Sequence, residues 1–256
     1  MNRLNRLFAR KPRNILSVYC TSGYPDMDAT RPVMRALQEH GADIIELGIP
    51  YSDPLADGPV IQHSNRVALG NGMTIKKLFA QLERFREEIS VPVILMGYMN
   101  PVLQYGFEKF CRDAALAGID GLILPDLPVI EYEKEYRDIL QNYKLDFIFL
   151  VTPETPPERV RKLDSLSSGF LYVVSASATT GGEQAAGNLD AYLDRLTGMG
   201  LKNKLLVGFG IRDKPGFDAV CRRADGVIIG SAYIKALENR GDVNATTKLF
   251  CASILG

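Results

Sequence analysis

The sequence predicts an α/β protein that folds as a single (β/α)8 barrel, a TIM barrel, over residues 1–256. Short β-branched runs alternate with longer segments of helical period about eight times. A chain of 256 residues is also a common length for one such barrel. No linker, low-complexity stretch or change in composition divides the chain. An open, doubly wound sheet is the alternative architecture.

Eight short segments are predicted to be strands. Their apolar residues follow one another almost without interruption, which is typical of parallel strands that are covered on both faces. In chain order the predicted strands are Ile15–Thr21, Asp43–Gly48, Pro92–Tyr98, Gly121–Leu124, Asp146–Val151, Phe170–Ser175, Lys204–Gly208 and Gly226–Gly230.

Helices are predicted in the gaps between these strands. Thr74 is a suitable N-cap for a helix that keeps apolar residues at helical spacing as far as Ile89. The helix predicted over Pro32–His40 stops before Gly41, a residue that favours a helix C-terminus. Two further predicted helices are Tyr132–Tyr143 and Pro156–Leu166, and Pro156-Pro157 suits a first helical turn.

The composition is typical of a soluble globular protein, with 46% hydrophobic and 23% charged residues. Thirty basic and thirty acidic residues give a formal net charge of zero. No overall field therefore favours nucleic acid or an anionic membrane, and neither is expected as a partner. Any specificity for phosphate has to come from a local site. The longest apolar runs have the length of strands, so no transmembrane helix is expected.

The four cysteines lie far apart and form no CxxC pair, so neither a metal site nor a disulfide framework is predicted. They are expected to be small buried hydrophobic residues in a reducing compartment. The basic N-terminal segment lacks the apolar stretch of a signal peptide. A cytoplasmic location is therefore expected. The cysteines are Cys20, Cys111, Cys221 and Cys251.

Two acids in and after the second predicted strand are the candidate catalytic residues. Glu46 lies inside an apolar run and shares a face with Ile44 and Gly48 on a period of two. If that face points into the barrel, burial raises the pKa of Glu46 and allows it to exchange a proton near neutral pH. Asp57 follows on a loop that is stiffened by several prolines.

Each acid also has an ordinary structural interpretation. A glutamate in a strand often pairs with a lysine or arginine, or marks the edge of a sheet. Asp57 before glycine and Asp53 before proline are common turn residues. Tyr51 and Ser52 are equally consistent with loop packing.

Three glycine-bearing loops after the last three predicted strands suggest a phosphate site. They are 175–182, 208–211 and 230–232. Glycine allows backbone N–H groups to approach an anion, and a helix that begins at Ser231 adds its positive end. Late loops of a barrel are a frequent phosphate site. No Lys-Ser or Lys-Thr follows these glycines, so a nucleotide P-loop is not predicted. Each glycine alone can also be a simple turn residue.

The segment 175–187 is predicted to be a long polar loop rich in small residues. Such a loop can act as a lid over a substrate. It is equally consistent with a solvated loop that has no role in binding.

The chain resembles the tryptophan synthase alpha subunit family along nearly its whole length. The resemblance rests on the block from Glu46 to Gly58 and on four shorter motifs. These are Thr21-Ser22-Gly23-Tyr24-Pro25, Pro125-Asp126-Leu127-Pro128, Gly208-Phe209-Gly210-Ile211 and Gly230-Ser231-Ala232.

The resemblance implies a lyase that cleaves indole-3-glycerol phosphate to indole and glyceraldehyde 3-phosphate by a retro-aldol reaction in tryptophan biosynthesis. It implies no cofactor and no metal in this subunit. It also implies a β subunit that receives the indole, in an α2β2 heterotetramer.

The resemblance further implies roles for individual residues. Glu46 matches the general acid–base, and Asp57 matches the acid that accepts a hydrogen bond from the indole N–H. Asp53, Asn100 and Pro128 match positions that face the β subunit. The implied substrate-binding residues are Tyr19, Ile61, Tyr98, Ile123, Tyr172, Thr180, Gly181, Phe209, Gly210, Gly230 and Ser231.

The sixth loop departs from the family pattern. Ala176 stands where the family commonly has arginine, and Ala178 where it has glycine, whereas Thr180-Gly181 is kept. A standalone lyase and a non-catalytic regulatory partner of the β subunit are therefore alternative functions. Another phosphosugar barrel is disfavoured, because a ring-closing synthase would need lysines at strand ends that carry Glu46 and Tyr98 instead.

Overall fold

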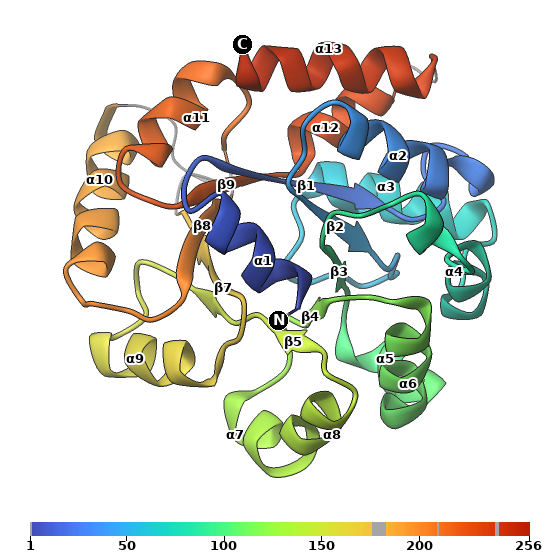
Figure 1. Cartoon of the computed structure of the whole chain (residues 1–256), viewed down its shortest axis with the longest axis horizontal. Coiled ribbons are helices and arrows are strands. Elements are labelled where there is room, and N and C mark those ends of the chain that lie inside the picture. The colour runs from blue at the N-terminus through green and yellow to red at the C-terminus, as the bar shows by residue number, and fades with distance from the viewer. Residues whose placement is uncertain (1, 176–182, 209, 239–240) are drawn as a thin grey trace.

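The fold is seen in a computed structural model of the chain. The structure describes residues 2–175, 183–208, 210–238 and 241–256, with the backbone alone described for 183–188. Parallel strands form a ring that is surrounded by helices (Figure 1). The strands are β1 (Ile15–Thr21), β2 (Ile44–Gly48), β3 (Val93–Met96), β4 (Gly121–Ile123), β5 (Asp146–Phe147), β6 (Leu150–Val151), β7 (Phe170–Val174), β8 (Lys204–Gly208) and β9 (Gly226–Ile229).

The ring closes through the segment 146–151, which contains both β5 and β6. The strands follow the order β5-β4-β3-β2-β1-β9-β8-β7-β6. Ile148 and Phe149 lie between β5 and β6 and bond to the strands on either side. The Ile148 N–H donates to the Leu122 carbonyl on β4 at 3.0 Å, and the Tyr172 N–H on β7 donates to the Phe149 carbonyl at 3.0 Å. The predicted strand Asp146–Val151 is thus one barrel strand with an interrupted middle. The predicted (β/α)8 barrel is confirmed.

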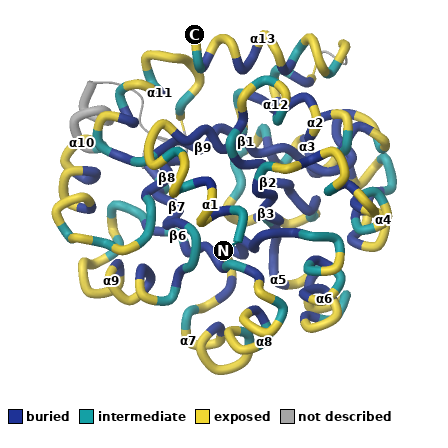
Figure 2. Tube along the Cα trace, viewed as in Figure 1, coloured by how far each residue is buried: buried dark blue, intermediate teal, exposed yellow. Residues whose placement is uncertain are grey.

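Helices cover the outside of the ring and leave the strands buried (Figure 2). Within the described residues they are α1 (Arg3–Arg10), α2 (Thr30–Glu39), α3 (Pro59–Gly70), α4 (Ile75–Gln81), α5 (Met99–Tyr105), α6 (Phe107–Ala117), α7 (Val129–Glu131), α8 (Arg137–Asn142), α9 (Pro157–Leu166), α10 (Glu183–Thr197), α11 (Lys214–Cys221), α12 (Ser231–Leu237) and α13 (Val243–Leu255), with a π-helical turn over Tyr132–Tyr136 and 3₁₀ turns over Met27–Ala29 and Phe85–Glu87.

Two predicted boundaries were wrong. The helix capped by Thr74 stops at Gln81, because the backbone turns into the left-handed region at Arg84 (φ 56°), although the apolar side chains beyond it are still buried. The predicted loop 175–187 ends early, because α10 begins at Glu183. The helix-forming residues that follow Gly182, namely Glu-Gln-Ala-Ala, outweigh the single Gly187.

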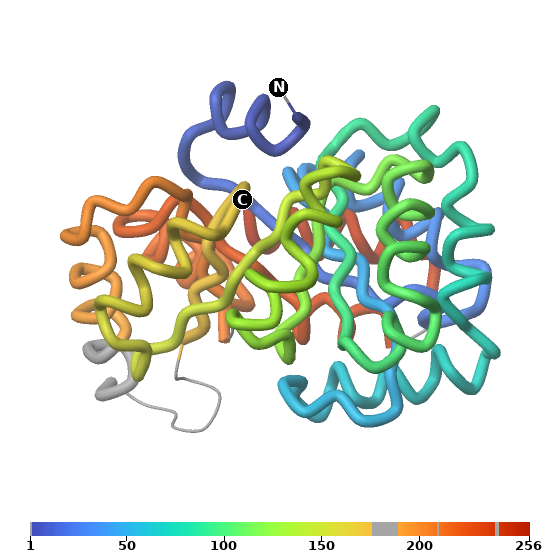
Figure 3. Tube along the Cα trace, turned by 90° about the horizontal axis from the view of Figure 1, so that it is seen from below, coloured from blue at the N-terminus to red at the C-terminus, as the bar shows by residue number. Residues whose placement is uncertain are grey.

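The interior of the barrel is filled by one apolar cluster, and helix α1 closes one end of it. Leu4 and Leu7 of α1 are buried in this cluster. Figure 3 shows α1 lying across that end of the ring. The other members come from the strands and the interrupted segment: Ile15, Ile44, Ile94, Ile123, Ile148, Phe170, Tyr172, Leu206 and Ile228.

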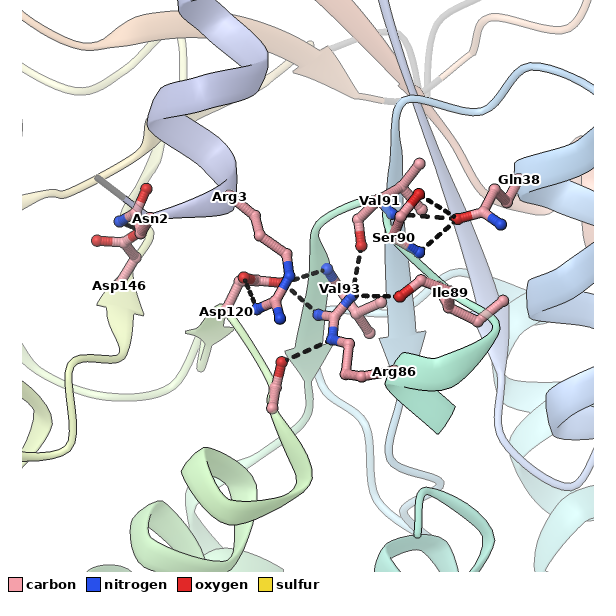
Figure 4. Close-up of polar contacts among 11 residues, drawn as sticks. Asn2, Arg3, Gln38, Arg86, Ile89, Ser90, Val91, Val93, Asp120 and Asp146 are labelled. Carbon is pink, nitrogen blue, oxygen red and sulfur yellow. Dashed lines mark hydrogen bonds and ion pairs between the residues drawn. The ribbon is translucent and has the colours of Figure 1, made fainter. Parts of the chain in front are cut away.

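Polar contacts fasten α1 to the barrel (Figure 4). The Arg3 guanidinium donates to Asp120 at 3.0 Å, and the Asn2 amide donates to Asp146 at 2.6 Å. Asp120 also accepts from Arg86 and from the Val93 N–H at 2.8 Å. Asp120 is therefore the point at which the helix, the barrel wall and the partly buried Arg86 are joined.

Candidate active site

Glu46 points into the barrel from β2. Its neighbour two residues earlier, Ile44, belongs to the interior cluster, whereas Ile45 and Leu47 pack in the outer core. The side chain of Glu46 is fully buried, and the Ser17 hydroxyl donates to its Oε1 at 2.8 Å. Its Oε2 has no hydrogen-bond partner among the described residues. An apolar strand therefore delivers a carboxyl group with one oxygen left for a ligand or water.

Burial raises the pKa of Glu46 to about 8, and the hydrogen bond from Ser17 opposes this shift. The carboxyl group is accordingly protonated at neutral pH and can donate a proton to a bound molecule. No ion pair to Glu46 is found within the described parts of the chain. The interpretation of Glu46 as a salt-bridged or edge residue does not fit this environment.

Two tyrosines lie over glycines beside Glu46. A Cβ on Gly48 would come within 2.1 Å of the Tyr19 hydroxyl, and a Cβ on Gly208 within 2.4 Å of the Tyr172 hydroxyl. Tyr19 lies opposite Glu46 in the parallel register of β1 and β2. Glycine is needed at both strand ends, because any larger residue would displace a ring from the pocket.

Asp57 lies on the loop after β2, just before α3. Its backbone carbonyl accepts from the Gln62 side chain at 2.8 Å, and its Oδ2 accepts from the Asn65 amide at 3.3 Å. The Tyr98 hydroxyl also interacts with its carboxylate. A loop of prolines, together with partners on α3 and at the start of α5, thus fixes this second acid.

Burial raises the pKa of Asp57 to about 6, and the contacts with Tyr98 and Asn65 oppose that shift. Asp57 is therefore mainly ionised at neutral pH, whereas Glu46 is protonated. Burial chiefly raises the pKa of Tyr172, and the charges of Glu46 and Asp57 raise it further, so the ring lies within electrostatic range of both acids. The two carboxyl groups have different proton affinities, as acid–base chemistry requires.

The structure brings several other predicted substrate-binding residues to the same end of the barrel. Ile123 is buried in the interior cluster, and Ile61 is buried on α3. A Cβ on Gly230 would lie 3.3 Å from that of Tyr19, so this loop borders the pocket. Ser231 begins α12 and is exposed, and Gly210 has a φ of 82°.

Three predicted residues, Thr180, Gly181 and Phe209, lie outside the described residues, as do Ala176 and Ala178. Their contribution to the site stays a prediction.

Two polar residues at the site were not predicted, Ser17 and Asn65. Ser17 shares the inward face of β1 with Ile15, so a hydroxyl in an apolar strand was the available signal. Asn65 is buried on the face of α3 that also carries Ile61 and Ala68. An amide among apolar helix positions is a comparable signal, because a buried amide requires partners.

Within the part of the chain that the structure describes, no group of three or more His, Cys, Asp or Glu residues is arranged to hold a metal ion. In the same residues, no helix combines the length and apolar character needed to cross a membrane. All four cysteines are buried, as predicted, and none of them forms a disulfide.

Comparison with known proteins matches this chain to one family. The family model described as tryptophan synthase alpha chain matches residues 6–252. The tryptophan synthase alpha chain of Bacteroides fragilis is 47% identical over 251 residues, which are 97% of this chain and 95% of the relative. That of Bacteroides thetaiotaomicron is 49% identical over 243 residues, which are 94% of this chain and 95% of the relative.

Solved structures give the same result. The tryptophan synthase alpha chain of Legionella pneumophila superposes with a TM-score of 0.88 at 34% identity, covering 99% of this chain and 96% of that one. A chain of Mycobacterium tuberculosis tryptophan synthase in an open form superposes with a TM-score of 0.86 at 36% identity, covering 99% of this chain and 98% of that one. The family model, the relatives and the matching barrel together show that the chain belongs to the tryptophan synthase alpha chain family.

Proposed function

We propose that this lyase cleaves indole-3-glycerol phosphate to indole and glyceraldehyde 3-phosphate, with Glu46 as proton donor and acceptor and Asp57 as its fixed negative partner. The observation that supports the proposal most directly is the pair itself. One acid is fully buried with an unpartnered oxygen, and the other lies at the same mouth and stays ionised. Family membership defines the reaction class, and these two groups supply the chemistry that it needs.

In the proposed mechanism, protonated Glu46 transfers its proton to C3 of the indole ring. The resulting carboxylate then takes the proton from the glycerol hydroxyl next to the ring. As that O–H bond breaks, a C=O bond forms, the bond between the glycerol carbon and C3 breaks, and its electron pair returns to the ring. The products are indole and an aldehyde, and Glu46 ends protonated as it began.

Asp57 stabilises the intermediate in this mechanism. Protonation at C3 leaves positive charge on the ring nitrogen, and an ionised carboxylate that accepts the ring N–H stabilises that charge. Its partners Tyr98 and Asn65 hold it in place before substrate binds, so little reorganisation accompanies the reaction. The expected roles of the two acids thus follow from their different environments.

The phosphate group is proposed to bind at the loops after the last strands. Gly210, Gly230 and Ser231 offer backbone N–H groups there, and Gly181 is expected to join them from outside the described residues. The open left-handed backbone at Gly210 and the position of Gly230 beside Tyr19 fit such a site. The neighbouring pocket residues Tyr19, Tyr172 and Ile123 are proposed to enclose the indole ring.

We also propose a cytoplasmic α2β2 assembly with a β subunit. Asp53, Asn100 and Pro128 are all exposed, which an interface requires. Leu55 is 94% exposed on the loop that carries Asp57, and Leu103 is 48% exposed on α5. Exposed leucines beside a catalytic loop suit a surface that a partner covers.

The catalytic proposal is tested by assaying indole release from indole-3-glycerol phosphate with Glu46→Gln and Asp57→Asn. Glu46→Gln is expected to abolish turnover, because an amide cannot deliver a proton. Asp57→Asn is expected to lower the rate by roughly 10²–10³, because the amide oxygen still accepts the N–H but carries no charge. Glu83→Gln on the exposed surface is the control. Full turnover by the Glu46 variant would contradict the mechanism.

A further inference from the structure

The Tyr98 hydroxyl holds the loop that carries Asp57 at two points. It accepts a hydrogen bond from the Ala56 N–H at 3.1 Å. It also interacts with the Asp57 carboxylate. One phenol group therefore fixes the backbone next to the catalytic acid and also opposes the rise that burial causes in the pKa of Asp57. Tyr98 is only 5% exposed, so the contacts are shielded from water.

The ring of Tyr98 is itself supported from outside by Tyr51. The two ring centroids are 5.5 Å apart with an angle of 35° between the planes. The Tyr51 hydroxyl accepts from the Asn100 amide at 3.0 Å, and the Met99 N–H donates to both carboxylate oxygens of Asp126 at 3.0 Å. The start of α5 is thus tied to the loop after β2 through Asn100 and Tyr51, and to the loop after β4 through Asp126.

We propose that Tyr98 is the positioning residue of Asp57 and that Tyr51 in turn orients Tyr98. The inference deepens the proposed function, because Asp57 is the group that is positioned. Tyr98 was predicted only to line the indole pocket, and its hydroxyl here has the further task of holding the loop that carries Asp57. Tyr51 needs no contact with substrate in this role, since it acts through its ring.

The hydroxyl of Tyr98 and the ring of Tyr51 make separable contributions. Loss of the Tyr98 hydroxyl releases the Ala56 backbone and removes a group that lowers the pKa of Asp57, so Asp57 should bind its proton more tightly. Loss of the Tyr51 ring should leave Tyr98 free to turn away. The proton affinity of Asp57 should then rise as well, but by less than after loss of the Tyr98 hydroxyl. Loss of the Tyr51 hydroxyl alone keeps the stacked rings and should leave Asp57 unchanged.

The test is an NMR titration of the Asp57 side-chain carboxyl carbon in the whole chain with labelled aspartate, assigned by the signal lost in Asp57→Asn. Tyr98→Phe is expected to move the titration midpoint up by about one pH unit, a tenfold change in proton affinity. Tyr51→Ala is expected to move it in the same direction by less, and Tyr51→Phe not at all. Tyr105→Phe is the matched control, because its hydroxyl also bonds an aspartate, Asp113, at 2.7 Å.

The outcomes separate this inference from the proposed function. An unchanged Asp57 midpoint in Tyr98→Phe overturns the role proposed for Tyr98. If the midpoint shifts in Tyr98→Phe but not in Tyr51→Ala, the role proposed for Tyr51 is overturned. Equal shifts in Tyr51→Phe and Tyr51→Ala also overturn the ring argument. The titration needs no turnover, so its result stands even if Asp57→Asn keeps full activity, which would contradict the proposed function alone.

Discussion

At the scale of single residues, the site depends on where two carboxyl groups lie relative to water. Glu46 is surrounded by the apolar interior of the barrel, and Asp57 by polar partners on a loop. Burial raises the pKa of both, but further for Glu46. The same burial therefore keeps one group protonated and leaves the other mainly ionised at pH 7.

This difference predicts a bell-shaped dependence of kcat/KM on pH. Glu46 must be protonated, so the rate should fall as pH rises through about 8. Asp57 must be ionised, so the rate should fall as pH drops through about 6. Ser17→Ala removes a hydrogen bond that lowers the pKa of Glu46, so its alkaline limb should move to higher pH while the acid limb stays. Movement of the acid limb alone would contradict the assignment.

At the scale of secondary-structure elements, α1 and the barrel wall depend on each other through Asp120. Its carboxylate is nearly buried and accepts from Arg3, Arg86 and the Val93 N–H. Arg86 is the more buried of the two arginines, with its side chain 15% exposed against 34% for Arg3. It also donates to the carbonyls of Gly118 and Val91. Arg86 thus has no easy access to water if Asp120 is lost.

Asp120→Ala is expected to lower the free energy of unfolding by about 3 kcal/mol, the low end for a broken buried pair, because the largely buried Arg86 loses its carboxylate partner but keeps its carbonyl partners. Arg3→Ala should cost at most about 1 kcal/mol, because Arg3 is partly exposed and its ion pair is screened by solvent. Urea unfolding of both variants measures the difference. Equal losses would show that the Arg3–Asp120 pair, and not the burial of Arg86, dominates.

At the scale of the whole molecule, the barrel, its strand positions and the inward orientation of Glu46 could be predicted from the sequence. Strand period placed Glu46 with Ile44, and that face does point inward. The break in the helix at Arg84 could not be predicted, because the apolar spacing continues through it and only the backbone changes. The partners of the two acids could not be predicted either. Ser17 is 29 residues from Glu46 in the sequence and Asn65 is 8 residues from Asp57, and only folding brings each pair into contact.

The proposed β subunit gives a prediction that concerns the intact assembly. If the partner covers the surface around Asp53, Asn100 and Pro128, a cognate β subunit should raise the rate of indole release by this chain. Asp53→Ala is expected to weaken that stimulation and leave the unaided rate unchanged. Titration of purified β subunit into the assay measures both quantities. Full activity without a β subunit, and no response to it, would instead support a standalone lyase.

Helix α1, which covers one end of the barrel, also affects how Glu46 exchanges its proton. Leu4, Leu7 and the rest of the interior apolar cluster fill the end of the barrel that α1 covers, which leaves the opposite mouth for a substrate to enter. When a substrate occupies that mouth, Glu46 has no path through the other end of the barrel by which to exchange its proton with bulk water. The proton it gives to the ring must then be replaced from the substrate's own hydroxyl, which ties bond cleavage to regeneration of the acid in each turnover.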